Sequence, residues 1–165
     1  PKYLAQFGAY GDPDRDPRSR VVTVGYLAIM PGVGRMRAGT DARRAELHPI
    51  GETQGRNPLI RLAFDHKKIL DDALGHARRQ LATTSIATAF MPTEFTIAEL
   101  RRVYEITWDI ELDPANFRRK VIATPNFVRP TGKRAKPGPE GGKPAELYQA
   151  SSKHLVPLVP PLQLD

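Results

Sequence analysis

Two helix-start signals in close succession, followed by a basic segment rich in proline and glycine, constrain this fold more than any other feature. Residues 96–99, TIAE, form a capping box, in which the threonine hydroxyl and the glutamate carboxylate each satisfy a backbone amide at a helix start. They predict a helix from about Ile97 that ends by Asp109. Asp113 and Pro114 then supply an N-cap and a proline at the first helical position. We therefore predict a second helix from Pro114 to about Ala123.

The residues after the second helix predict a β-hairpin. Residues 127–129 favour a short strand, residues 130–144 a Pro/Gly/Lys hairpin loop, and residues 145–150 the returning strand. The order is helix, turn, helix and hairpin with a basic tip. This is the layout of a winged helix-turn-helix, in which the second helix enters the major groove of DNA and the hairpin tip touches the flanking backbone.

The distribution of charge agrees with a nucleic-acid partner. The chain of 165 residues has 25 Lys and Arg against 18 Asp and Glu, a net charge of +7. Residues 116–144 alone hold eight basic residues against the single acid Glu140, which equals the whole surplus. Such an excess is expected where phosphates are neutralised, although a solvated basic loop is the alternative for a charge run taken alone. The helix pair around this run favours DNA binding.

A helical wheel at about 100° per residue assigns the faces of the second helix. It turns three apolar residues inward: Phe117, Val121 and Ile122. It places five residues on the opposite side: Ala115, Asn116, Arg119, Lys120 and Ala123. Arg can bond guanine and Asn adenine in the major groove, and Lys serves guanine or a phosphate. Arg118 falls nearer the apolar flank, where we expect it to brace the helix or reach a phosphate. The predicted DNA-binding residues are Asn116, Arg118, Arg119, Lys120, Lys133, Arg134, Lys136 and Lys143.

The first half of the chain carries fewer signals. Residues 21–30, VVTVGYLAIM, predict a buried strand. From His66 to Leu81 the apolar residues recur at helical spacing, which predicts an amphipathic helix with Asp65 as its N-cap. The weaker predictions are strands at 1–8 and 43–50, loops at 31–42 and 51–58, and a connector or short helix at 83–92. The proline-rich residues 151–165 predict either a packed extended tail or a mobile one.

Residues 11–31 (GDPDRDPRSRVVTVGYLAIMP), 63–70 (AFDHKKIL) and 95–149 carry a family resemblance. On these blocks the chain resembles the Nudix-related transcriptional regulators of bacterial NAD metabolism, the NrtR type. The resemblance implies an α+β fold, with a partial Nudix-like α/β sandwich followed by a C-terminal winged helix-turn-helix domain. It divides the chain into a partial sensor domain (1–65), a linker helix and connector (66–92), a winged domain (93–150) and a tail (151–165).

The chain departs from the Nudix pattern in one respect. The Nudix box needs Arg-Glu and Glu-Glu pairs on one helix to hold a divalent cation, and this sequence contains neither dipeptide. Family order places the box just before Pro1, and a first residue other than Met agrees with residues upstream. We therefore expect no catalytic residues, no metal site and no nucleotide hydrolysis in this chain. Mg²⁺ is expected only if an upstream box is present.

The resemblance implies a repressor of NAD-biosynthesis genes that binds a pseudo-palindromic operator as a homodimer and responds to ADP-ribose or a related nucleotide. Asp16, Arg18 and Arg20 lie where Nudix-like domains approach their nucleotide, and an arginine there could hold a diphosphate. A salt bridge within the loop is an equal alternative. The second hypothesis is a Nudix-type ADP-ribose or nucleotide-diphosphate hydrolase whose box lies upstream, and the third is a protein-binding structural module.

Composition excludes several other classes. With no cysteine, the chain has no disulfide, no thiolate nucleophile and no Cys-based metal site. It shows neither a signal peptide nor a membrane-spanning run, so we expect a soluble, cytoplasmic protein. Five residues are of the types that can bind a metal ion: Asp65, His66, Asp71, Asp72 and His76. Their positions at a helix start or in surface pairs on a helix account for them better than a metal site does. The glycines of residues 31–39 predict a hairpin loop because they lack the setting of a phosphate loop.

Overall fold

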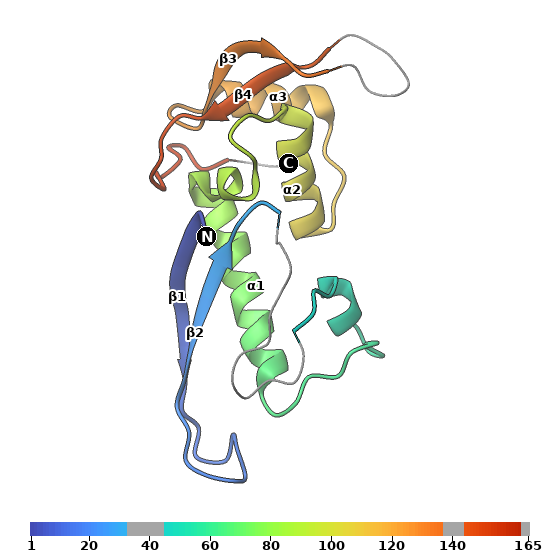
Figure 1. Ribbon diagram of the computed structural model, residues 1–165, viewed down its shortest axis with the longest axis vertical. Coiled ribbons are helices and arrows are strands. Elements are labelled where there is room, and N and C mark those ends of the chain that lie inside the picture. The colour runs from blue at the N-terminus through green and yellow to red at the C-terminus, as the bar shows by residue number, and fades with distance from the viewer. Residues whose placement is uncertain (33–44, 137–143, 163–165) are drawn as a thin grey trace. The chain divides into compact units, whose positions relative to one another are not determined.

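The computed structural model describes residues 1–32, 45–136 and 144–162 (Figure 1). The chain has two compact units, one made of Pro1–Leu4, Ala28–Pro31 and His76–Asp165 and the other of Ala5–Leu27 and Gly32–Gly75. In chain order the elements are β1 (Tyr3–Tyr10), β2 (Thr23–Ile29), the 3-10 turn η1 (Ile50–Thr53), α1 (His66–Thr83), the 3-10 turn η2 (Ser85–Phe90), α2 (Ile97–Trp108), α3 (Pro114–Ala123), β3 (Val128–Arg134) and β4 (Glu146–Ala150). Within the described residues, none of the helices is both long and apolar enough to cross a membrane.

The strands β1 and β2 form a two-stranded sheet. Both were predicted, but the prediction that β2 is buried is wrong, because only one of its faces is covered. Gly25 is buried, whereas Val24 and Tyr26 are 45% and 59% exposed. A Cβ atom on Gly25 would lie 2.5 Å from the Phe7 ring, so a larger residue at this position would require that ring to move. The strand predicted over 43–50 is also wrong for its described residues, since residues 45–49 are irregular and Ile50 begins η1.

The amphipathic helix α1 is confirmed and runs two residues beyond its predicted end. Its predicted N-cap, Asp65, has a long-range partner that the sequence did not reveal. The Asp65 carboxylate accepts two hydrogen bonds from the Arg15 guanidinium, at 2.8 and 2.9 Å. This pairing lowers the pKa of Asp65. The short helix predicted in 83–92 is confirmed as η2.

Both predicted caps of the helix pair are confirmed. The Thr96 hydroxyl accepts from the Glu99 amide at 3.2 Å, and the Glu99 carboxylate accepts from the Thr96 amide at 2.7 Å. At the start of α3 the Asp113 carboxylate accepts a hydrogen bond from the backbone amide of Asn116 at 2.7 Å, and Pro114 occupies the first helical position. Local sequence therefore sets where each helix begins, independently of the packing that follows.

The core between α2 and α3 is aromatic. Tyr104 is fully buried, packs edge-on against Phe117 with ring centroids 5.4 Å apart, and stacks on Trp108 at the same distance. Burial raises the pKa of the Tyr104 hydroxyl well above its usual range. Phe117 and Val121 face inward as predicted, but Ile122 is 50% exposed and its predicted inward orientation is wrong. Ile122 follows Val121 by one residue, so its side chain lies about 100° further around the helix axis, away from the buried face.

The hairpin has a longer first strand than predicted, and a third segment pairs with it. Lys133 and Arg134 lie in β3 rather than in the loop, because the antiparallel pairing continues to Arg134, opposite Glu146. The register shifts between Pro130 and Arg134, where Gly132 adopts a φ of +76°. Phe95 exchanges two backbone hydrogen bonds with Tyr148 of β4, at 2.7 and 2.9 Å. In Figure 1 the resulting sheet lies over α2 and α3.

The tail is packed over residues 156–162, which resolves the alternative left open by the sequence. The Leu158 amide donates to the Thr83 carbonyl at 2.8 Å, and the Leu162 amide donates to the Ala82 carbonyl at 3.0 Å. Both leucine side chains are buried, with exposures of 2% and 6%. The extended tail therefore satisfies carbonyls at the C-terminal end of α1 that have no partner within the helix.

The packing of the tail can be tested with a matched pair of variants. We expect Leu158→Ala to lower the free energy of unfolding by about 2–4 kcal/mol, because it removes a fully buried side chain. Val159→Ala changes the neighbouring side chain, which is 72% exposed, and should alter stability by less than about 0.5 kcal/mol. Urea denaturation followed by circular dichroism measures both values, and equal effects would show that the tail does not pack as described.

Candidate nucleic-acid interface

The outer face of α3 presents the side chains predicted to read DNA bases. Ala115, Arg119 and Ala123 are exposed, and Asn116 and Lys120 are half-buried. One guanidinium nitrogen of Arg119 donates to the side-chain oxygen of Asn116 at 2.7 Å. The structure thus brings two of the predicted base-reading residues into contact on one helix face. This contact lines up the amide and the guanidinium as neighbouring hydrogen-bonding groups.

Arg118 connects α3 to the hairpin. Its guanidinium donates to the Glu146 carboxylate at 3.0 Å and to the Tyr148 hydroxyl at 2.9 Å, and lies 5.5 Å from the centroid of the Tyr148 ring. Hydrogen bonds from the Tyr148 hydroxyl and from Arg118 lower the pKa of Glu146. Of the two roles expected for Arg118, the structure shows the bracing one.

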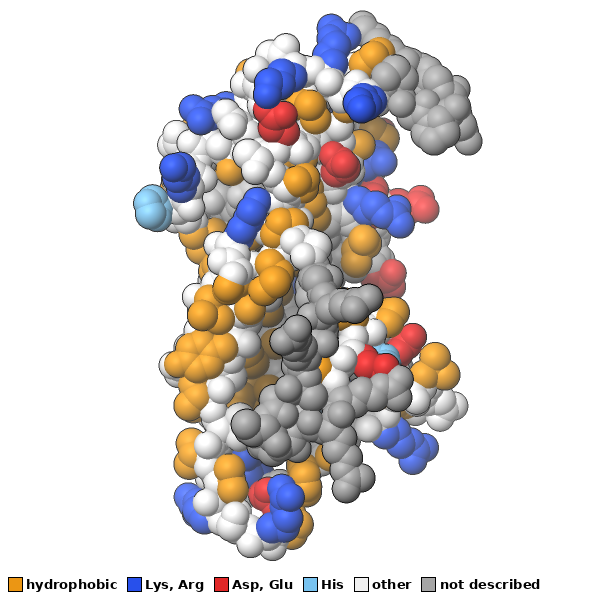
Figure 2. Space-filling model, in the orientation of Figure 1, with side chains coloured by type: hydrophobic (Ala, Val, Ile, Leu, Met, Phe, Trp, Pro, Cys, Tyr) orange, Lys and Arg blue, Asp and Glu red, His pale blue; other side chains and the backbone are white. Residues whose placement is uncertain are grey.

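The predicted wing cations occupy different settings. Lys133 donates to the Glu94 carboxylate at 2.8 Å, so it links β3 to the segment that precedes α2. Arg134 ends β3 and Lys136 follows it, and both are exposed. Lys143 lies outside the described residues. Figure 2 shows Lys and Arg side chains gathered over the part of the molecule formed by α3 and the hairpin.

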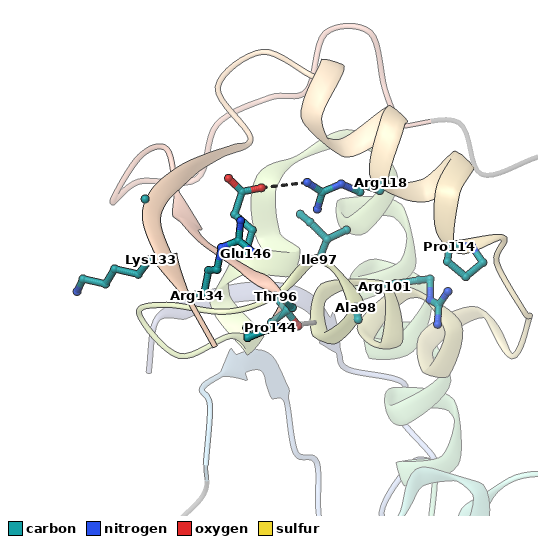
Figure 3. A pocket seen from close by; sticks show the side chains of 12 residues that line it. Thr96, Ile97, Ala98, Arg101, Pro114, Arg118, Lys133, Arg134, Pro144 and Glu146 are labelled. Atoms are coloured by element: carbon teal, nitrogen blue, oxygen red, sulfur yellow. Dashed lines mark hydrogen bonds and ion pairs between the residues drawn. The ribbon is translucent and has the colours of Figure 1, made fainter. Parts of the chain in front are cut away.

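A groove of about 640 Å³ separates the start of α2 and the start of α3 from the hairpin (Figure 3). Four cations line it: Arg101, Arg118, Lys133 and Arg134. Arg118 and Glu146 reach toward each other across this groove in Figure 3. The first turns of two helices also border it, and helix N-termini carry partial positive charge. The groove therefore suits a polyanion such as the phosphate backbone of DNA.

Arg101 is the groove residue that sequence reasoning missed. Its guanidinium lies 3.2 Å from the Glu105 carboxylate and donates to the Leu112 carbonyl at 3.4 Å. The four-residue spacing of Arg101 and Glu105 on a predicted helix was a signal for this ion pair. Nothing in the local sequence indicated that Arg101 would line the same groove as Lys133 and Arg134 of the hairpin.

The predicted effector residues form an ion pair within their own loop. Arg18 donates two side-chain hydrogen bonds to the Asp16 carboxylate, at 2.7 and 2.9 Å, and its backbone amide donates a third at 3.0 Å. These bonds lower the pKa of Asp16 to about 2. The Arg18 guanidinium lies 5.2 Å from the centroid of the Phe64 ring. Arg20 is exposed. The loop salt bridge that the sequence left open is therefore present.

The residues considered as metal ligands are engaged in other contacts. Asp71 and Asp72 accept from Lys67 and Lys68, one helical turn earlier, at 2.8 and 2.9 Å. The His76 ring lies 3.2 Å from the Tyr3 hydroxyl. Over the described ranges 1–32, 45–136 and 144–162, no group of three His, Asp or Glu is arranged to hold a metal ion.

Comparisons with known proteins place this geometry in context. Residues 87–150 match the family model described as the NrtR DNA-binding winged helix domain. The chain is 31% identical over 147 residues to a protein of Acinetobacter baylyi named "ADPR responsive transcriptional repressor NtrR", covering 89% of this chain and 56% of that protein. It is 40% identical over 72 residues to the ADP-ribose pyrophosphatase of Methanocaldococcus jannaschii, covering 44% of this chain and 38% of the enzyme. The chain thus spans about half the length of the first of these relatives.

Solved structures show the same architecture. The crystal structure of Shewanella oneidensis NrtR matches with a TM-score of 0.72 and 25% identity, covering 91% of this chain and 65% of that one. The same protein complexed with a 27mer DNA matches with a TM-score of 0.66 and 24% identity, over 91% of this chain and 65% of that one. A MutT/nudix family protein from Enterococcus faecalis matches with a TM-score of 0.64 and 24% identity, over 90% of this chain and 62% of that one. The predicted combination of a Nudix-like part and a winged helix domain is thereby confirmed.

The ion pair in the candidate effector loop makes a specific prediction. Arg18→Gln removes the side-chain donors that contribute most to the low pKa of Asp16, so that pKa should rise from about 2 toward its ordinary value of 3.8. Arg20→Gln serves as the control, and should leave the pKa of Asp16 unchanged. Following the Asp16 carboxyl carbon by NMR over an acid titration gives the value directly, and an unshifted pKa in Arg18→Gln would refute the pairing.

Proposed function

From the premise that residues 87–150 are an NrtR-type winged helix domain in a chain related to Nudix-related regulators, we propose that this protein is a sequence-specific DNA-binding transcriptional repressor. The observation that carries the proposal is the outer face of α3. There Asn116 and Arg119 are placed together, on the side opposite the buried Phe117 and Val121. A helix with an apolar inner face and an amide–guanidinium outer face has the chemistry to read base edges.

Recognition divides between α3 and the hairpin. On entering the major groove, Arg119 exchanges its bond to Asn116 for guanine and Asn116 turns to adenine, while Lys120 contacts a guanine or a phosphate. Lys133, Arg134, Lys136 and Lys143 neutralise backbone phosphates, which releases counterions and fixes the register of the protein on the duplex. Arg118 maintains the angle between α3 and β4, and any phosphate contact it makes competes with Glu146.

Regulation and assembly form the second part of the proposal. We place the target genes in NAD biosynthesis, as the family resemblance implies, and the effector in the ADP-ribose class, which the name of the Acinetobacter baylyi relative supports. The Asp16, Arg18 and Arg20 loop is the proposed effector contact, since a diphosphate would replace the Asp16 carboxylate as the partner of Arg18. A homodimer on a pseudo-palindromic operator in the cytoplasm completes the proposal, because two symmetric copies read two half-sites.

Hydrolysis of ADP-ribose is the second candidate function, favoured by the likeness to the Methanocaldococcus jannaschii pyrophosphatase. The chemistry needs carboxylates that converge on a divalent cation beside the substrate phosphates. In this chain Asp16 and Asp65 are held by arginines, and Asp72 by Lys68 and the Tyr10 hydroxyl. These partners support a regulator rather than an enzyme.

Base reading by α3 can be tested by alanine substitution. Asn116→Ala and Arg119→Ala should each weaken binding to a duplex selected from a random library by about 5- to 150-fold, or about 1–3 kcal/mol. Binding to random DNA should change little. Arg102→Ala, an exposed change on α2, is the control. Fluorescence anisotropy measures all four proteins, and wild-type affinity in both α3 variants would exclude α3 as the recognition helix.

The enzymatic candidate is tested separately. We expect the purified chain to release neither AMP nor ribose phosphate from ADP-ribose in the presence of Mg²⁺ or Mn²⁺, because Asp16, Asp65 and Asp72 already have basic or hydroxyl partners. Chromatography of the reaction against a sample without protein detects the products. Turnover that persists through further purification would support the hydrolase instead.

A further inference from the structure

A second pocket lies at the end of the hairpin remote from its tip. It has a volume of about 390 Å³ and lies between η2, the last residues of β4 and residues 151–155, with Lys2 and Tyr3 also lining it. All of these residues belong to the unit that contains the winged helix domain. The volume falls within the range of small-molecule sites, roughly 300–1,000 Å³.

The pocket is separated from the DNA-reading surface by the strand geometry. Arg129 and Gln149 are directly opposed on β3 and β4. Because side chains alternate between the two faces of a strand, Gln149 points away from the face that carries Glu146 and Tyr148. The face that carries Glu146 and Tyr148 is the one turned toward α3, because both side chains accept hydrogen bonds from Arg118. A duplex bound to α3 therefore lies on the other side of the hairpin from Arg129.

The charged side chains that line this pocket are all basic among the described residues. Its cationic side chains are Lys2, Arg129 and Lys153, with His154 beside them, and no Asp or Glu is among the described residues that line it. The groove beside α3 differs in this respect, because Glu146 lies within it. Hydroxyl groups of Thr93, Ser151 and Ser152 add further hydrogen-bonding groups. Cations and hydroxyls without a carboxylate are the groups that bind a phosphate.

Two of the cations are held at the pocket by the protein itself. The Lys2 ammonium donates to the Met91 carbonyl at 2.5 Å. With the Gln149 amide oriented so that its oxygen faces Arg129, the guanidinium donates to it at 2.9 and 3.1 Å. These bonds leave donors on each cation for a ligand and reduce the side-chain freedom that binding would remove.

We propose that this pocket binds the phosphate group of a small phosphorylated molecule of about the size of a mononucleotide. The proposal does not depend on α3 reading DNA, since the two surfaces share no residue named above. A backbone phosphate of DNA offers the same chemistry, but the position of Arg129 on the other face of the hairpin favours a free ligand.

Calorimetric titration of the 165-residue chain with AMP tests the proposal, with adenosine as the matched ligand that lacks the phosphate. We expect AMP to bind and adenosine not to bind. The double variant Arg129→Gln/Lys153→Gln should raise the Kd for AMP at least tenfold, and Lys2→Gln alone should raise it by a smaller factor. Arg79→Gln, an exposed change on α1 outside the pocket, is the control and should leave the Kd unchanged.

Three results would overturn the proposal: no heat from AMP at millimolar concentration, equal affinity for AMP and adenosine, or an unchanged Kd for AMP in the double variant. Fluorescence anisotropy with the selected DNA duplex then distinguishes a free ligand from the DNA backbone. The double variant should retain the DNA affinity of the wild type, and a loss of that affinity without AMP binding would assign the pocket to the DNA backbone and refute a free ligand. Circular dichroism melting curves verify that each variant is folded.

Discussion

Tyr148 joins three parts of the winged helix domain: the segment before α2, the helix α3 and the hairpin. Its backbone pairs with Phe95, at the entry to α2, and its position in β4 is opposite Pro130 of β3. Its hydroxyl donates to Glu146 and accepts from Arg118 of α3. Because Tyr148 is only 4% exposed, removing its side chain would uncover the core and would also remove the hydroxyl that bonds both Arg118 and Glu146. The Tyr148 side chain and the Arg118–Glu146 ion pair together join α3 to the hairpin.

The arrangement around Tyr148 divides the basic residues by role. Arg118 and Lys133 pair with Glu146 and Glu94, so much of their charge stabilises the domain itself. Arg119 on the outer face of α3 and Arg134 at the end of β3 are exposed to solvent. A sum of charges over residues 116–144 therefore includes cations that have a carboxylate partner within the domain. The sequence predicted which residues are basic, but it could not predict which of them pair with a carboxylate inside the domain.

Features set by neighbouring residues could be predicted from the sequence, and features set by distant contacts could not. The caps at Thr96 and Asp113 act within one helical turn, so the starts of α2 and α3 were predicted correctly. The pairing of Arg15 with Asp65 joins residues fifty positions apart, and that of Phe95 with Tyr148 has no local signal. Burial of β2 was overestimated because an apolar run does not reveal whether a second layer covers both faces. In the candidate site, the partners of Arg118 could not be predicted either, because Glu146 and Tyr148 are distant from it in the sequence.

The central claim is that the outer face of α3 and the adjoining part of β3 meet DNA together. Titrating the ¹⁵N-labelled chain with its selected duplex, and following each backbone amide by NMR, tests it directly. The account predicts the largest shift changes at residues 115–123 and 131–136, with residues 3–10 of β1 unaffected. Unchanged signals over 115–123, with shifts confined to other elements, would contradict it.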